Sequence, residues 1–306
     1  MNDSKQVLVF GATGNIGGAA TRELLQRGWQ VRAVTRNPQG EKTQALASFG
    51  AEVVQADMDD RASLEKAFDG LTRVFSVQNW TTDGIDGEIR QGKLVADVAK
   101  AAGVTHLVYG SAGTGKPNTG VPHFECKLVV ENHMRDELGL PTTAVRPGPF
   151  MELMNQKEFF PALAAWGAMP KVVGWETPVP WTAVSDIGTA IANIFDNPDK
   201  WIGQDTHLIG HFESLRDCQT IFKKRTGKKP FGLPLPLALF NKMAGSEFVV
   251  MWRWMEGFLA EMGLDERQAM VDASREACAD LHSVESWLAL SRKENPIPSF
   301  QDGVNA

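Results

Sequence analysis

A glycine-rich turn near the amino terminus constrains the fold of this chain more than any other segment. The motif Gly11-Ala-Thr-Gly14-Asn-Ile-Gly17 follows the apolar run Val7-Leu-Val-Phe10 and leads into the amphipathic stretch 19–26. This order predicts a strand, a tight turn and a helix whose free N–H groups and positive dipole end point at one place, where a pyrophosphate is stabilised. We therefore expect a dinucleotide site with these contacts: Gly11, Thr13, Gly14, Asn15, Ile16 and Gly17.

An arginine follows the second expected strand. The run 30–35 ends in Thr35-Arg36-Asn37, where a fold that prefers NAD would place an acidic residue to hold the ribose 2′-hydroxyl. A guanidinium can pair with the additional 2′-phosphate of NADP, whereas a carboxylate would repel it. The sequence therefore predicts NADP(H) as the cofactor with Arg36 at its adenosine end, and the alternative is an exposed surface arginine.

Strand-like and helix-like runs alternate through the first half of the chain, which predicts an α/β, Rossmann-type doubly wound parallel sheet. The expected strands cover residues 7–10, 30–35, 52–57, 73–78, 105–110 and 142–146, and the expected helices cover 41–49, 63–68, 88–102 and 123–138. Beyond Arg146 proline and tryptophan become dense, and helical patterns return at 187–195, 215–226, 237–262 and 265–279, before a short helix that Ser283 caps. We therefore predict an NADP-binding Rossmann domain over residues 1–150 and a smaller, mixed C-terminal substrate or cap region over 151–306, with helices returning to the sheet.

Composition limits the partners. The net charge of −6 argues against a general nucleic-acid surface, and the basic cluster 223–229 is better explained as the solvated end of a helix. Three cysteines without metal spacing predict free thiols in a reducing compartment. No charged-then-apolar leader precedes the first strand, and charges interrupt the most apolar stretch, 248–262. The sequence thus predicts a cytoplasmic protein that binds neither nucleic acid nor membrane.

Ligands of an open α/β sheet bind beyond the carboxyl ends of its strands, so the residues after each strand are candidate contacts. Asp57 and Met58 follow the third strand and are expected near the adenine, although Asp57, with its acidic neighbours, can instead start the next helix. The run Gln78-Asn79-Trp80 follows the fourth strand and is expected beside the nicotinamide end. Ser111, which precedes a flexible glycine-rich loop, and Pro147, after the sixth strand, complete the expected cofactor contacts.

The sequence resembles the NmrA-like branch of the atypical short-chain dehydrogenase/reductases. The resemblance covers at least residues 7–186 and rests on the glycine motif together with the segments 34–38, 91–93, 103–111, 123–127 and 141–147. It implies that Lys127 contacts the nicotinamide ribose. The alternative for Lys127 is an ordinary surface lysine.

The proton donor departs from the superfamily pattern. Conventional members carry a tyrosine four residues before the lysine, whereas this chain has His123 there and its single tyrosine, Tyr109, lies in the fifth expected strand. An imidazole with an unperturbed pKa near ~6.5 can donate a proton at neutral pH, so we predict His123 and Lys127 as the catalytic pair. His123 can alternatively order the loop at the start of its helix.

Aromatic and thioether side chains gather after the sixth expected strand, where the resembled family builds its substrate pocket. They are Phe150, Met151, Met154, Phe159, Phe160, Trp166, Trp175 and Trp181. We expect Trp80, Phe150, Met151, Met154 and Trp181 to line a pocket for a flat, apolar ligand, and the alternative is ordinary core. A further set at helical spacing, Trp252, Met255, Phe258, Leu259 and Met262, favours core packing or a subunit interface over a binding site.

Two functions follow from the resemblance. The first is an NADP(H)-dependent reductase of a small apolar carbonyl, quinone or enone, with His123 or water supplying the proton. The second is a non-catalytic, redox-sensing regulator that binds NADP(H) and changes its affinity for a protein partner. The missing tyrosine favours the second function, whereas Lys127 and the apolar cluster favour the first. The expected associations are a small-molecule substrate and either a homodimer or a regulatory protein partner.

Overall fold

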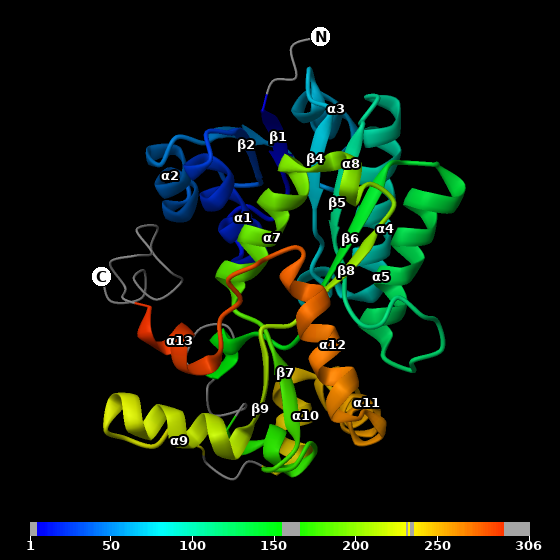
Figure 1. Cartoon of the computed structure of the whole chain (residues 1–306). Coiled ribbons are helices and arrows are strands. Elements are labelled where there is room, and N and C mark those ends of the chain that lie inside the picture. The colour runs from blue at the N-terminus through cyan, green and yellow to red at the C-terminus, as the bar shows by residue number, and fades with distance from the viewer. Residues whose placement is uncertain (1–4, 155–165, 231, 233–235, 291–306) are drawn as a thin grey trace. The chain divides into compact units, whose positions relative to one another are not determined.

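The computed structural model describes residues 5–154, 166–230, 232 and 236–290 of the chain (Figure 1). The chain divides into two compact units. The first takes residues 1–117, 123–146 and 187–206, and the second takes 118–122, 147–186 and 207–306. The division at residue 150 stays a prediction, and the first unit includes a segment from the later half of the sequence.

The central sheet has seven strands in the order β3-β2-β1-β4-β5-β6-β8. The paired strands from β3 to β6 are parallel, and the order reverses between β1 and β4, as in a doubly wound sheet. The strands are β1 Gln6–Val9, β2 Gln30–Thr35, β3 Glu52–Gln55, β4 Arg73–Ser76, β5 His106–Gly110, β6 Thr142–Pro147 and β8 Asp205–Leu208. The predicted Rossmann-type fold is confirmed, and β8 is a strand that the sequence analysis did not anticipate.

Helices cover both faces of this sheet (Figure 1). The helices are α1 Asn15–Gln26, α2 Glu41–Ser48, α3 Arg61–Phe68, α4 Trp80–Ala101, α5 Pro122–Asn132, α7 Val184–Asp196 and α8 Pro198–Trp201. A π-helical turn, His133–Glu137, extends α5. On one face, Leu64, Val95 and Val130 of α3, α4 and α5 pack with strand residues in a single apolar core. On the other face, α1 and α7 approach so closely that a Cβ at Gly188 would lie 2.7 Å from the backbone of Ala19.

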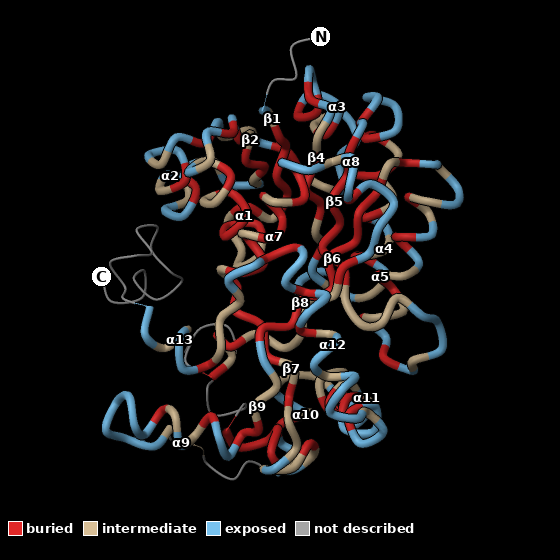
Figure 2. Tube along the Cα trace, viewed as in Figure 1, coloured by how far each residue is buried: buried red, intermediate tan, exposed pale blue. Residues whose placement is uncertain are grey.

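The strands at the centre of the sheet are almost continuously buried, as Figure 2 shows for β1, β5 and β6. Parallel strands covered by helices on both faces have this pattern, because neither face meets water. The catalytic candidates therefore lie at the ends of the strands, where the backbone leaves the core.

The second unit has a two-stranded antiparallel sheet, β7 Pro178–Trp181 with β9 His211–Ser214, and 3₁₀ turns at Met151–Met154 and Met169–Lys171. Its helices are α9 Leu215–Thr226, α10 Leu237–Ala244, α11 Glu247–Glu261, α12 Leu264–Arg275 and α13 Val284–Ala289. A capping box between Ser214 and Asp217 starts α9, and Ser283 caps α13 as predicted. The single helix expected over 237–262 is wrong, because Gly245, with φ +86°, ends α10 before α11 begins.

All three cysteines are free and buried. Within the described ranges, no helix combines the length and the apolar character that crossing a membrane requires.

Candidate cofactor and catalytic site

The turn before α1 leaves no space for a side chain at two of its glycines. Gly11 has φ +63°, a conformation that favours glycine, and a Cβ at Gly17 would lie 2.8 Å from the carbonyl oxygen of Phe10. Gly14 is the N-cap of α1, no side chain caps the helix, and its first turn carries no acidic residue. Thr13, Asn15 and Ile16 are half-buried around this turn. The N–H groups of the first turn therefore have no competing side-chain acceptor, which suits the binding of a pyrophosphate.

Arg36 is exposed immediately after β2, and its backbone oxygen accepts a 3.3 Å hydrogen bond from Nε2 of Gln55. No carboxylate occurs between the end of β2 and Glu41. Arg36 is thus exposed at the strand end where the predicted 2′-phosphate contact requires it.

The residues after β3 form a hydrogen-bonded entrance to α3. Asp57 Oδ1 accepts from the backbone N–H of Asp59 at 2.9 Å, and Asp60 is the N-cap of α3. Met58 is half-buried, and its sulfur lies 3.6 Å from Nε2 of Gln78. Asp60 is therefore the capping residue, while the half-buried Asp57 remains a candidate for the adenine contact.

The residues after β4 occupy different environments. Gln78 is buried, and its Nε2 donates to Ser76 Oγ at 2.9 Å. The exposed Asn79 is the N-cap of α4 and accepts from the N–H of Thr81 at 3.1 Å. Trp80 stacks on His123, with ring centroids 5.3 Å apart and an interplanar angle of 17°. The end of β4 thus brings Trp80 to the predicted catalytic helix.

His123 is buried and contacts a second aromatic ring besides Trp80. The ring of Phe124 meets it edge-on, with ring centroids 4.7 Å apart. Burial, together with the nearby charge of Lys127, lowers the pKa of His123 from 6.5 to about 4. The prediction of an imidazole with an ordinary pKa is therefore wrong. At pH 7 the ring is neutral, and it can donate a hydrogen bond but is a poor source of a full proton.

Lys127 is 8% exposed, which excludes the surface-lysine alternative. Its Nζ donates to Glu88 Oε1 at 2.6 Å, to the Gly110 carbonyl at 3.1 Å and to the Gln78 carbonyl at 3.4 Å. The ammonium thus joins α5 to α4 and to the ends of β4 and β5.

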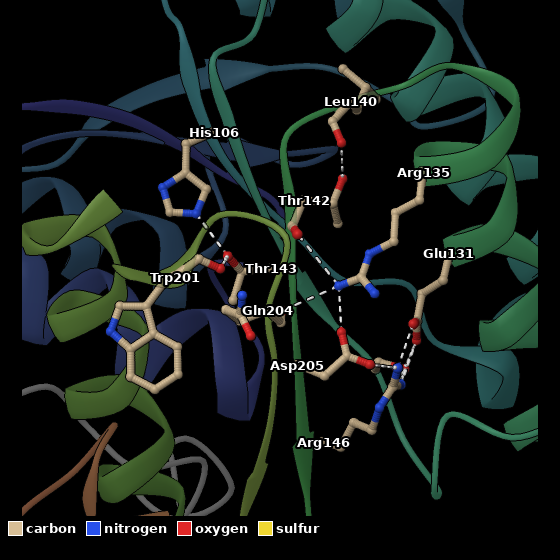
Figure 3. Close-up of polar contacts among 11 residues, drawn as sticks. His106, Glu131, Arg135, Leu140, Thr142, Thr143, Arg146, Trp201, Gln204 and Asp205 are labelled. Atoms are coloured by element: carbon tan, nitrogen blue, oxygen red, sulfur yellow. Dashed lines mark hydrogen bonds and ion pairs between the residues drawn. The ribbon is translucent and has the colours of Figure 1, made fainter. Parts of the chain in front are cut away.

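Ser111 belongs to a buried ionic network beyond β5. Its hydroxyl donates to Glu131 of α5, and Arg146 Nη1 donates to Ser111 Oγ at 2.6 Å. Figure 3 shows Glu131, Arg135, Arg146 and Asp205 pointing toward one another from α5, the π-helical turn, β6 and β8. A cofactor contact through the Ser111 hydroxyl would therefore share an oxygen already engaged with Arg146. Pro147, which ends β6, is half-buried.

The predicted pocket residues after β6 lie in the second unit. Trp181, Met151 and Met154 are at most 2% exposed and belong to its apolar core, with Trp166. Their burial favours the core alternative for these three side chains. Phe150 is half-buried and Trp175 packs against the same core. Phe159 and Phe160 lie outside the described residues.

The later helical set is mainly core. Trp252, Met255 and Leu259 are buried. Phe258 is exposed, and its ring stacks on that of Trp254 with ring centroids 5.0 Å apart. Met262 packs against the same core.

Two acidic residues of the site were missed by the sequence analysis, Glu88 and Glu131. Glu88 occurs at helical spacing with buried positions of α4, including Gly92, Val95 and Ala99. An acid at such a position is a signal for a buried cation, and this signal could have been found. No group of three His, Cys, Asp or Glu side chains that could hold a metal ion occurs in the described part of the chain.

A family model described as the NmrA-like family matches residues 3–288. This chain belongs to the NmrA-like family. A curated relative from Aspergillus japonicus, the NmrA-like family domain-containing oxidoreductase himF, is 32% identical over 244 residues, which is 73% of each chain.

Solved structures share the fold. One is NmrA, a negative transcriptional regulator, in complex with NADP, with a TM-score of 0.72, 22% identity, and coverage of 94% of this chain and 95% of that one. Another is the triphenylmethane reductase of Citrobacter sp. complexed with NADP(H), with a TM-score of 0.72, 20% identity, and coverage of 93% and 99%. At these identities the likeness concerns the fold.

Proposed function

We propose that this chain is an NADP(H)-dependent reductase of a small apolar carbonyl, quinone or enone. The observation that carries the proposal is the first turn of α1, which no side chain caps and which follows a tight turn where a Cβ at Gly11 or Gly17 would clash with Val77 or with the carbonyls of the turn. The exposed Arg36 after β2 supports the phosphorylated cofactor. Relatives named oxidoreductases support the reaction class.

The side chains of the first unit have distinct roles in this proposal. The bound NADPH would supply a hydride to the substrate. Lys127 binds the nicotinamide ribose, and Trp80 offers an aromatic face to a flat substrate. His123, neutral at pH 7, donates a hydrogen bond to the substrate oxygen, and water delivers the proton. Asp57, Met58, Gln78 and Asn79 remain proposed cofactor contacts.

The test is NADPH oxidation with a panel of quinones, enones and aromatic ketones. Native protein should turn over at least one acceptor, and His123→Ala and Lys127→Ala should each slow it by roughly tenfold or more, because each removes a hydrogen bond to the reacting pair. Tight NADP(H) binding without turnover of any acceptor would contradict the reductase.

A redox-sensing regulator is the second candidate. The absence of a tyrosine four residues before Lys127 favours it, as does the complete burial of Tyr109. The NmrA described as a negative transcriptional regulator in complex with NADP has a similar fold. In this case partner and nucleotide must change each other's affinity by the same factor, which paired binding titrations measure.

A further inference from the structure

All three N–H donors of Lys127 already meet acceptors of this chain. An ammonium has three donors, and the acceptors are one carboxylate oxygen of Glu88 and the carbonyl oxygens of Gly110 and Gln78. A ribose hydroxyl can therefore bind this ammonium only by replacing one of them. The bond to Gln78, at 3.4 Å, is the longest and hence the easiest to give up.

Glu88 has the opposite character. Its side chain is fully buried, and its Oε1 lies 2.6 Å from Lys127 Nζ. Because both charges are withdrawn from water, neither can lose its partner without a large cost. The ring of Tyr109 lies on the same ammonium, with Nζ 5.4 Å from the ring centroid. Glu88 and Tyr109 thus fix Nζ from α4 and from β5.

We propose that Glu88 is a positioning residue for the nicotinamide ribose, a role that rests on the proposed cofactor site. It holds Lys127 Nζ at the carboxyl ends of β4 and β5, and the ribose takes the place of the Gln78 carbonyl. Glu88 acts through Lys127 and touches no part of the cofactor. Its contribution is therefore confined to the nicotinamide half of the dinucleotide.

Calorimetric titration with two ligands tests this restriction. NADPH carries the nicotinamide ribose, whereas adenosine 2′,5′-bisphosphate carries only the adenosine half. In the full chain, Glu88→Gln should lower the affinity for NADPH roughly tenfold, which corresponds to the loss of one charge-assisted hydrogen bond. The same change should alter the affinity for the bisphosphate less than about twofold. Arg36→Ala should lower the affinity for both ligands.

Two further variants separate positioning from general loss of structure. Asp97→Asn removes a carboxylate from the same helix, where Asp97 pairs with His133, and should leave the ratio of the two affinities unchanged. Glu88→Gln/Lys127→Met should bind NADPH no more weakly than Lys127→Met, because Glu88 acts through that lysine. Lys127→Met alone leaves the charge of Glu88 without a partner and can fail to fold. In that case the NADPH affinity of the double variant, which leaves no unpaired charge, is compared with that of native protein.

The outcomes are distinguishable. Unchanged NADPH affinity in Glu88→Gln, or equal losses for NADPH and the bisphosphate, overturns the role of Glu88 and leaves the proposed cofactor intact. No heat from native protein with either ligand overturns the proposed function and this inference together.

Discussion

His123 lies four residues before Lys127, where the sequence analysis predicted a proton donor, but its neighbours change what it can do. Trp80 covers one face of the imidazole and Phe124 meets its edge. Desolvation is the larger cause of its low pKa, and the charge of Lys127 adds to it. Burial in this environment therefore favours the neutral ring, and the sequence position alone could not reveal this.

Replacing Trp80 with alanine should raise the pKa of His123 from about 4 toward 6.5, because the ring regains contact with water. An NMR titration of the imidazole protons measures the change. Trp80→Phe retains an aromatic cover and should keep the low value. His106, whose pKa burial also lowers to about 4, serves as an internal reference at the amino end of β5. A pKa of His123 that stays near 4 in Trp80→Ala would show that other atoms bury the ring.

At the level of elements, the network around Arg146 connects α5, β6 and β8. The guanidinium donates to both oxygens of Glu131 at 2.5 Å and to Asp205 at 2.8 Å, and the side chain of Glu131 is 3% exposed. A pair this buried contributes little beyond an apolar replacement, but losing one member leaves an unpaired charge.

Arg146→Met should therefore lower the unfolding free energy by about 3–5 kcal/mol. Glu131→Gln/Arg146→Met should recover most of this loss, since neither charge is stranded. Urea unfolding measures both values. Asp272→Asn, which breaks the exposed pair with Arg275, is the control and should have little effect. Equal losses in the single and double variants would refute the stranded-charge explanation.

The repeating elements were predictable because apolar periodicity and glycine or serine boundaries mark them. The parallel strands, α9 and the Ser283 cap follow from such local signals. The start of α4 was missed because Gly84, with φ +74°, breaks the helical pattern between Trp80 and Glu88. In strand β8 the first three residues, Asp205-Thr-His207, are polar, so it lacks the apolar run that marks the predicted strands, and its place beside β6 depends on long-range pairing.

The site was predictable to a different extent. The glycine turn is a local motif, so its geometry follows from neighbouring residues. The partners of Lys127 come from α4, from β5 and from the segment between β4 and α4, and no spacing in the sequence connects Glu88 with it. The low pKa of His123 likewise depends on burial in the tertiary structure, where Trp80 of another helix stacks on the imidazole. Contacts of this kind are set by tertiary packing, which a single sequence does not encode in a readable pattern.

At the scale of the whole molecule, groups that titrate between about pH 4 and 7 have pKa values shifted in opposite directions in the two units. In the second unit, burial raises the pKa of Glu152 to about 7, and the hydrogen bond to Asp186 raises that of His282. Their stabilisation is present below the unfolded-state pKa and is lost as the pH rises through the folded-state value. In the first unit, the lowered values of His106 and His123 act in the opposite sense between about pH 4 and 6.5.

We therefore expect the balance of stability between the units to change with pH. Raising the pH from 5 to 8 should increase protection of the first unit relative to the second, as measured by hydrogen exchange after correction for the intrinsic rate. Glu152→Gln keeps an acceptor for Trp287 Nε1 but has no charge to bury. It should therefore reduce the pH-dependent change in the free-energy difference between the units by about 3 kcal/mol at most. Glu285→Gln, at an exposed carboxylate on α13, controls for the loss of one charge. If the second unit instead gains protection relative to the first as the pH rises, burial of Glu152 does not govern its stability.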